Sequence, residues 1–181
     1  MPMAYEMQEQ LRPGDRVTVV GSGPNYHFVP SNPWVAVRWR KRSEIEFPVA
    51  EYLGRKGIAF NPAGAKRVHP ERNQVELGDG AMLDYDYLVI ATGPKLAFDE
   101  IEGLGPEGHT QSVCHVDHAE RAADAWDAFV KDPGPIVVGA VQGASCFGPA
   151  YEFCFIMETD LRRRKIRDRV PMTFVTAEPY I

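Results

Sequence analysis

A cysteine at the end of a glycine-rich turn is the residue of this sequence best placed to do chemistry. Residues 135–152 are PIVVGAVQGASCFGPAYE, a pattern that predicts a buried strand at 136–138, a turn and the start of a helix. Such a turn directs backbone N–H groups and the positive end of a helix dipole at one point. Cys146 lies in this turn and is a candidate nucleophile, because a thiolate is stabilised there. The alternative is that Cys146 is a small buried hydrophobic residue.

The elements expected on either side of this turn are those of an α/β protein. Helices are expected at 4–11, 47–55 and 116–131 and after Cys146, and strands at 16–20, 85–94, 136–138 and 170–176. The strand expected within 85–94 is apolar on both faces, which is typical of the middle of a covered parallel sheet. Four short alternating runs at 58–60, 65–68, 74–77 and 81–83 predict a small antiparallel meander.

The order of these elements predicts tandem Rossmann-like dinucleotide-binding units with an antiparallel β-meander. In a parallel sheet the first helix should itself follow a strand. Only three residues precede that helix here, so we expect the first strand and its turn to be missing and the chain to be an incomplete fragment.

The composition excludes several classes of function. The 181 residues carry a net charge of −5, which argues against nucleic acid as the main partner. No apolar run is long enough to span a bilayer, and there is no signal-peptide pattern. Three widely spaced cysteines do not make a disulfide framework, and no Cys/His cluster has zinc-ligand spacing, so no metal is expected.

Several polar and apolar groups are assigned to the scaffold. The proline-rich stretch 28–34 is expected to be a loop without regular structure. Two basic clusters are expected to be solvated: Arg38, Arg40, Lys41 and Arg42, and then Arg162, Arg163, Arg164, Lys165 and Arg167. One side of the helix after Cys146 is expected to carry Phe147, Tyr151, Cys154, Phe155 and Leu161. Cys154 would lie about 12 Å from Cys146 along that helix, too far for a disulfide, and is expected in the core.

The chain resembles the flavoprotein disulfide reductase superfamily and, within it, the sulfide:quinone oxidoreductases. The resemblance covers essentially the whole chain, and five stretches carry it. They are MPMAYEM at 1–7, FVPSNPW at 28–34, YDYLVIATGPKLAF at 85–98, SVCHVDHAERA at 112–122 and GASCFGPAYEF at 143–153. The ATG turn marks only the superfamily, whereas FVPSNPW together with GASCFGPAYEF is far more specific.

The resemblance implies a non-covalent FAD. Gly21 and Ser22 would approach the adenosine ribose, although the acidic residue usual at that point is missing, so Ser22 or the backbone must hold the ribose. Pro30, Ser31, Asn32 and Pro33 would line the flavin, and Ala91, Thr92, Gly93 and Pro94 would pack on the cofactor. The alternative for the ATG turn is a tight strand exit with no ligand.

The same resemblance implies sulfide and quinone as substrates. Cys146 matches one cysteine of a redox pair whose second member lies beyond residue 181, and Cys114 matches an assisting third cysteine. His118 matches a histidine that handles a proton or sulfide. From its position alone His118 could equally be structural.

With the resemblance, the expected domains are a partial FAD-binding domain at 1–110, with the meander at 58–84, and the first half of a second Rossmann-like domain at 111–181. The first strand and GxGxxG turn of the FAD domain would be missing. We therefore expect these residues alone to bind FAD weakly or not at all and to be inactive. The full-length protein would be peripheral to the membrane and could form a homo-oligomer.

A valine occupies the second glycine position of the second dinucleotide-binding unit, and this residue distinguishes a sulfide:quinone oxidoreductase from an NADH-dependent enzyme. That glycine normally lets a dinucleotide pyrophosphate approach, so Val141 argues against NAD(P) binding and against a type II NADH dehydrogenase. Two further alternatives remain. One is a protein like the flavoprotein subunit of flavocytochrome c sulfide dehydrogenase, and the other is a non-catalytic nucleotide-binding remnant.

Overall fold

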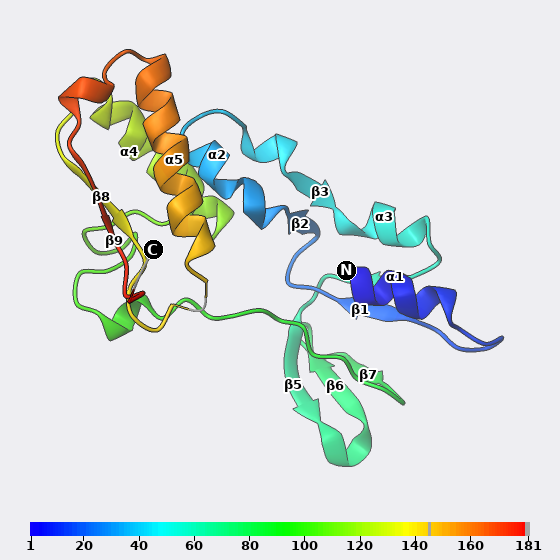
Figure 1. Ribbon diagram of the computed structural model, residues 1–181. Helices are drawn as coiled ribbons and strands as arrows, with labels where there is room; N and C mark the ends of the chain where they lie inside the picture. The colour runs from blue at the N-terminus through cyan, green and yellow to red at the C-terminus, as the bar shows by residue number, and fades with distance from the viewer. Residues whose placement is uncertain (145, 180–181) are drawn as a thin grey trace. The chain divides into compact units, whose positions relative to one another are not determined.

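A computed structural model describes residues 1–144 and 146–179, and it divides the chain into two compact units (Figure 1). The first unit contains residues 1–26 and 46–95, and the second contains 27–45 and 96–181. Each unit is therefore built from two separate stretches of sequence. The division of the chain at 110/111 stays a prediction.

The first unit combines a parallel strand pair with an antiparallel meander. Its elements are α1 (Pro2–Glu9), β1 (Thr18–Val20), β2 (Asn25–His27), β3 (Glu46–Pro48), α3 (Val49–Gly54), β4 (Ala59–Asn61), β5 (Ala65–His69), η3 (Pro70–Arg72), β6 (Gln74–Leu77) and β7 (Met82–Asp84). Strands β5, β6 and β7 form the meander, as predicted, and β2 pairs with β3. Side chains of Ala4, Val49, Leu53 and Ile58 form the small core of this unit.

Two expectations for the first unit are wrong. The run at 58–60 does not join the meander, because β4 pairs in parallel with β1 in the register Thr18 to Ala59. The stretch 85–94 forms no strand, and Tyr87 and Ile90 are 87% and 68% exposed. An apolar, β-branched run becomes a strand only when a neighbouring strand supplies hydrogen bonds. None of the described strands pairs with this one.

The second unit packs helices on a parallel strand pair. Its elements are η1 (Val29–Ser31), α2 (Asn32–Ala36), η2 (Arg42–Glu44), η4 (Phe98–Glu100), α4 (Val116–Phe129), β8 (Ile136–Gly139), α5 (Gly148–Arg163), η5 (Arg167–Arg169) and β9 (Met172–Val175). Strands β8 and β9 are parallel, with Ile136 opposite Met172. This β8–α5–β9 crossover is the strand–turn–helix–strand predicted around Cys146.

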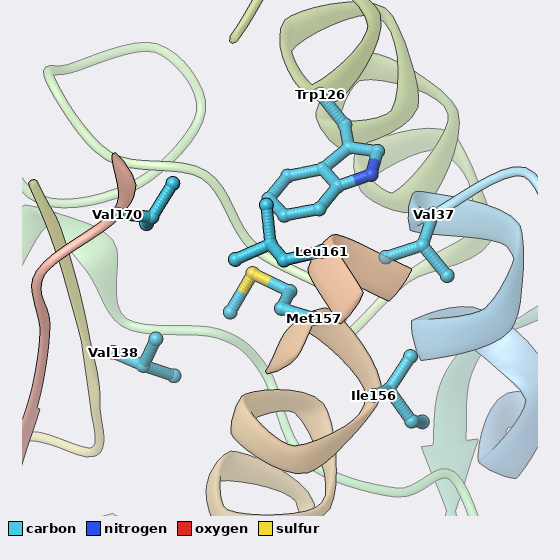
Figure 2. Packing of buried hydrophobic residues seen from close by; sticks show 7 residues of the cluster. All are labelled: Val37, Trp126, Val138, Ile156, Met157, Leu161 and Val170. Carbon is cyan, nitrogen blue, oxygen red and sulfur yellow. The ribbon is translucent and has the colours of Figure 1, made fainter. Parts of the chain in front are cut away.

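One hydrophobic cluster holds the second unit together. It consists of Val37, Trp126, Val138, Ile156, Met157, Leu161 and Val170, and Figure 2 shows these side chains gathered between α4, α5, β8 and the residue after α2. Cys154 packs against this cluster, as predicted, but Phe155 is 68% exposed. The helical periodicity of α5 is therefore right, while its buried face is turned toward Ile156 and Met157.

The basic cluster after α2 is not a free solvated face. Arg38, at φ +63°, pairs with Asp124 and lies 2.9 Å from Asp127, and Arg42 lies 2.5 Å from Asp117 and 3.0 Å from Glu120. The four acidic residues lie on one face of α4 at helical spacing, so each arginine pairs with two carboxylates. These pairs are partly exposed and are worth at most about 1 kcal/mol each, and they link the segment after α2 to α4.

Candidate functional site

The turn that carries Cys146 begins where β8 and β9 approach each other closely. A Cβ added at Gly139 would lie 2.0 Å from the Val175 carbonyl oxygen, so only glycine allows β8 to pair to this point. The chain then turns through Gly143 at φ +84° and enters α5 at Gly148. Gly139 is therefore required for close strand pairing, and Gly143 for a left-handed turn.

Cys146 lies in this turn, two residues before α5, and its side chain is exposed. The alternative of a buried hydrophobic cysteine is therefore wrong. Ser145, which belongs to the same motif, lies outside the described residues. Val141 is 39% exposed on the same turn. An exposed thiol on a crossover turn can meet a nucleophile from solvent, which a core thiol cannot.

Cys114 is also exposed and lies in a bend two residues before α4. Its backbone N–H donates to the Ser112 hydroxyl at 3.1 Å. The preceding carbonyl, that of Val113, accepts a hydrogen bond from Asn32 Nδ2 at 3.0 Å. The structure thus joins two of the motifs, FVPSNPW and SVCHVDHAERA, through a side chain of the first and the backbone of the second.

His118 lies in the first turns of α4 between two other rings. Its ring centroid is 5.7 Å from that of Phe98 and 5.7 Å from that of His115. Burial lowers the pKa of His118 from its ordinary value of 6.5, and the charges of His115 and Arg121 lower it further. Asp117 and Glu107 oppose the shift. The result is an imidazole that is neutral at pH 7, with a buried Nδ1 that has no hydrogen-bond partner among the described residues.

Acid is expected to destabilise the protein through His118. Because its pKa is lower in the folded than in the unfolded chain, the unfolded chain takes up the proton first as the pH falls. The contribution of His118 is therefore complete above pH 6.5 and is lost as the pH falls toward the folded-state pKa. We expect His118→Gln to flatten the pH dependence of the free energy of unfolding between about pH 7 and 5. Urea unfolding across this range measures it, and an unchanged slope would contradict the burial of His118.

The FVPSNPW stretch is not the irregular loop expected. It forms η1 and the start of α2, and only Pro30 of its four predicted flavin-lining residues is exposed. Ser31, Asn32 and Pro33 are buried. The Arg40 guanidinium donates to Ser31 Oγ at 2.6 Å and stacks on the Trp34 ring at 3.9 Å. Prolines at the first positions of both turns start these helices rather than prevent them.

The remaining residues predicted to hold a cofactor belong to the first unit. Gly21 follows β1, where its N–H donates to Asn61 and its carbonyl accepts from Gly64, and Ser22 is exposed. Ala91, Thr92, Gly93 and Pro94 are all exposed. A Cβ built on Gly93, at φ +73°, would meet nothing within 4 Å. This small-residue segment leaves the backbone open to a flat group, so the residues present fit a flavin there.

The structure therefore brings Asn32, Cys114 and His118 into one neighbourhood of the second unit, and Cys146 into the same unit. Sequence reasoning did not identify Val113, His115 or Phe98 as their neighbours. His115 could have been found, because it precedes His118 by three residues and residues at that spacing share a helix face. Phe98 could not, since it comes from a distant loop. In the described part of the chain no group of three or more His, Cys, Asp or Glu side chains could hold a metal ion.

The helices of the described residues include none that is long and apolar enough to cross a membrane. No family model matches the chain.

Comparison with known proteins finds curated relatives and solved structures, of which three are described here. The chain is 40% identical over 178 residues to the sulfide-quinone reductase of Aquifex aeolicus, covering 98% of this chain and 40% of that protein. It is 25% identical over 185 residues to the mitochondrial sulfide:quinone oxidoreductase of Dictyostelium discoideum, again covering 98% and 40%. The crystal structure of the Aquifex aeolicus enzyme superposes with a TM-score of 0.91, over 98% of this chain and 41% of that one.

The chain thus spans about 40% of the length of the curated relatives that it matches. The predicted α/β class is confirmed, because the superposition extends over nearly all of the described chain. The resemblance seen in the five motifs is confirmed as well: along its whole length, this chain is related in sequence and fold to the sulfide:quinone oxidoreductases.

Proposed function

We propose that this chain is part of a flavin-dependent sulfide:quinone oxidoreductase in which Cys146 carries the sulfur chemistry. The observation that supports the proposal is the exposure of Cys146 at the β8–α5 turn, in a chain that aligns over 98% of its length with such an enzyme. A structural cysteine would be buried, as Cys154 partly is. The activity belongs to a protein of the relatives' full length.

The cofactor in this proposal is FAD. The residues of this chain that would hold it are those with open backbone, Ala91–Pro94, together with Gly21 and Ser22 at the end of β1. Of the four residues at 30–33 that the resemblance assigns to the flavin, Pro30 is exposed, whereas Ser31, Asn32 and Pro33 are buried. When bound, the flavin accepts two electrons and passes them to the quinone.

The chemical step proposed for Cys146 is disulfide exchange. In the oxidised state Cys146 is bonded to a second cysteine outside this chain. Hydrosulfide attacks one sulfur of this bond, so that a new sulfur–sulfur bond forms a persulfide and the other cysteine leaves as a thiolate. A second hydrosulfide takes the outer sulfur of the persulfide, so that a hydrodisulfide leaves and both cysteines of the pair are thiols. When these two thiols form the disulfide again, they lose two protons and the two electrons that a bound flavin would accept.

His118 and Cys114 assist in this proposal. The neutral His118 imidazole, kept neutral at pH 7 by its lowered pKa, can take the proton that hydrogen sulfide loses when it becomes hydrosulfide. Cys114, exposed four residues before His118, can take over the outer sulfur of a persulfide formed at the Cys146 pair: the Cys114 thiolate attacks that sulfur, and the donor cysteine leaves as a thiolate. In this reading the enzyme is peripheral to the membrane, since the quinone that it reduces is dissolved there.

Anaerobic titration with sulfide tests this proposal in a protein that carries the chain at the full length of its relatives. Sulfide should bleach the flavin absorbance, with two electrons taken up per flavin, and an added quinone should restore the absorbance. NADH should not bleach it, because Val141 obstructs the nucleotide site. Bleaching by NADH, or absence of bleaching by sulfide, would contradict the proposal. Restoration by cytochrome c but not by quinone would indicate a flavocytochrome-type enzyme.

A further inference from the structure

A completely buried amide side chain holds the backbone next to Cys114. Asn32, at the start of α2, is 0% exposed. Its Nδ2 donates to the Val113 carbonyl at 3.0 Å, across 81 residues of sequence. Its Oδ1 is buried and has no hydrogen-bond partner among the described residues.

The half-satisfied amide has an energetic cost that packing alone would not explain. A buried polar atom without a partner is destabilising, and an apolar side chain of similar volume would avoid that cost. What an apolar side chain could not do is donate to Val113. The hydrogen bond to the Val113 carbonyl therefore distinguishes Asn32 from a residue that only fills space in the core.

The segment held by Asn32 decides where the Cys114 thiol points. Val113 packs its side chain against the cluster of Val35, Ala36, Ile45, Val116, Ala119 and Ala122. Val116 is 1% exposed. His115 between them is extended, at φ −131° and ψ 153°. With Val113 and Val116 held inward on either side of this bend, Cys114 between them stays exposed.

We propose that Asn32 is a positioning residue that presents the Cys114 thiol to solvent by fixing the Val113 carbonyl. The geometric part of this proposal stands on the hydrogen bond and the burial. Its importance for sulfide chemistry rests on the function proposed above. Loss of the bond frees the backbone at 112–115 while the core contacts of α4 remain, so the effect is local.

Two nearly isosteric substitutions separate hydrogen bonding from packing. Asn32→Leu keeps the volume and removes the donor at every pH. Asn32→Asp keeps the shape, but a protonated Asp donates to the Val113 carbonyl whereas an ionised one repels it. Hydrogen exchange of the amides at 112–115, divided by the wild-type rate at the same pH, is the measurement.

We expect Asn32→Leu to raise the hydrogen-exchange rate of the amides at 112–115 roughly fivefold to tenfold at all pH values. This factor corresponds to the free energy that one hydrogen bond contributes. Asn32→Asp should approach the wild-type rate at low pH and exceed it increasingly as the pH rises. Amides of α5 serve as the internal control and should not change. Iodoacetamide labelling should change at Cys114 and stay constant at Cys146 in the same molecule.

Equal exchange in the wild type and Asn32→Leu, or the same pH dependence in both variants, would overturn the proposal. If neither variant folds, the smaller Asn32→Ser decides, because it cannot overpack and is expected to lose protection at 112–115 alone. Neither measurement needs turnover. Absence of sulfide oxidation in the wild type would contradict the proposed function but not the positioning role of Asn32. Unchanged hydrogen exchange in the Asn32 variants would contradict the positioning role but not the proposed function.

Discussion

Replacing Cys146 by serine is expected to reduce sulfide-dependent quinone reduction at least about a thousandfold, the scale on which enzymes lose rate without their nucleophile. A serine hydroxyl cannot form a disulfide or a persulfide, so hydrosulfide has no sulfur to attack. The side chain is exposed on a turn, and the substitution removes no core packing. Steady-state kinetics with a soluble quinone measure the loss, and flavin absorbance shows whether the variant still folds and holds its cofactor.

The matched control is Cys154, which lies eight residues further along the chain, within α5. Burial raises the pKa of its thiol, and the side chain packs against the core. We expect Cys154→Ala to keep its turnover while losing some stability, because a partly buried side chain becomes smaller. Cys114→Ser should have an intermediate effect on turnover. Normal turnover in Cys146→Ser, or equal losses in the Cys146 and Cys154 variants, would remove Cys146 from the mechanism.

Asp160 carries the largest expected effect on stability. This carboxylate on α5 is 4% exposed and accepts hydrogen bonds from the indole N–H groups of Trp39 and Trp126, both at 2.8 Å. It also accepts from Arg164 Nε at 2.6 Å. Asp160→Ala would leave two indole donors without an acceptor and a cation without its partner. We expect a loss of about 3–5 kcal/mol in the free energy of unfolding, typical of breaking a buried charged network.

Two variants show which part of this network matters. Asp160→Asn keeps one acceptor oxygen for an indole and should cost less than alanine. Arg164 is about one-third exposed, so Arg164→Ala should cost no more than about 1 kcal/mol. Urea unfolding of all three variants gives the comparison. Equal stability of Asp160→Ala and the wild type would show that the indole groups find other acceptors and that the network does not hold α4 and α5 together.

Elements with strong local patterns were predictable from the sequence. The apolar residues of α4 recur at helical spacing until the helix stop at 132–134. The turn after β8 is marked by glycines, which are required by the local backbone conformation. The place of Cys146 in this turn was predictable, whereas its exposure came from the structure, because the sequence left a buried thiol open as the alternative. Each of these features depends on residues within a few positions of one another, so no distant contact had to be known.

Contacts between distant segments could not be predicted in this way. The run at 58–60 lies outside the meander because β4 pairs with β1. This pairing could not be predicted, since a short apolar run does not indicate which strand it will pair with. The stretch 85–94 has strand composition but no partner strand among the described residues. The same limit applies to the arginines of the 38–42 cluster, whose acidic partners on α4 lie more than 70 residues away.

The sequence by itself determined the fold class, the resemblance to the sulfide:quinone oxidoreductases and the choice of Cys146 as the candidate nucleophile, because motifs, periodicity and turn residues are local properties. Only the tertiary structure decided what surrounds these residues: the two indoles on Asp160, the rings beside His118, and the buried amide of Asn32 on the Val113 carbonyl. The physical reason is that burial and hydrogen-bond partnership are properties of pairs of segments. They exist only once chain-distant residues have been brought together.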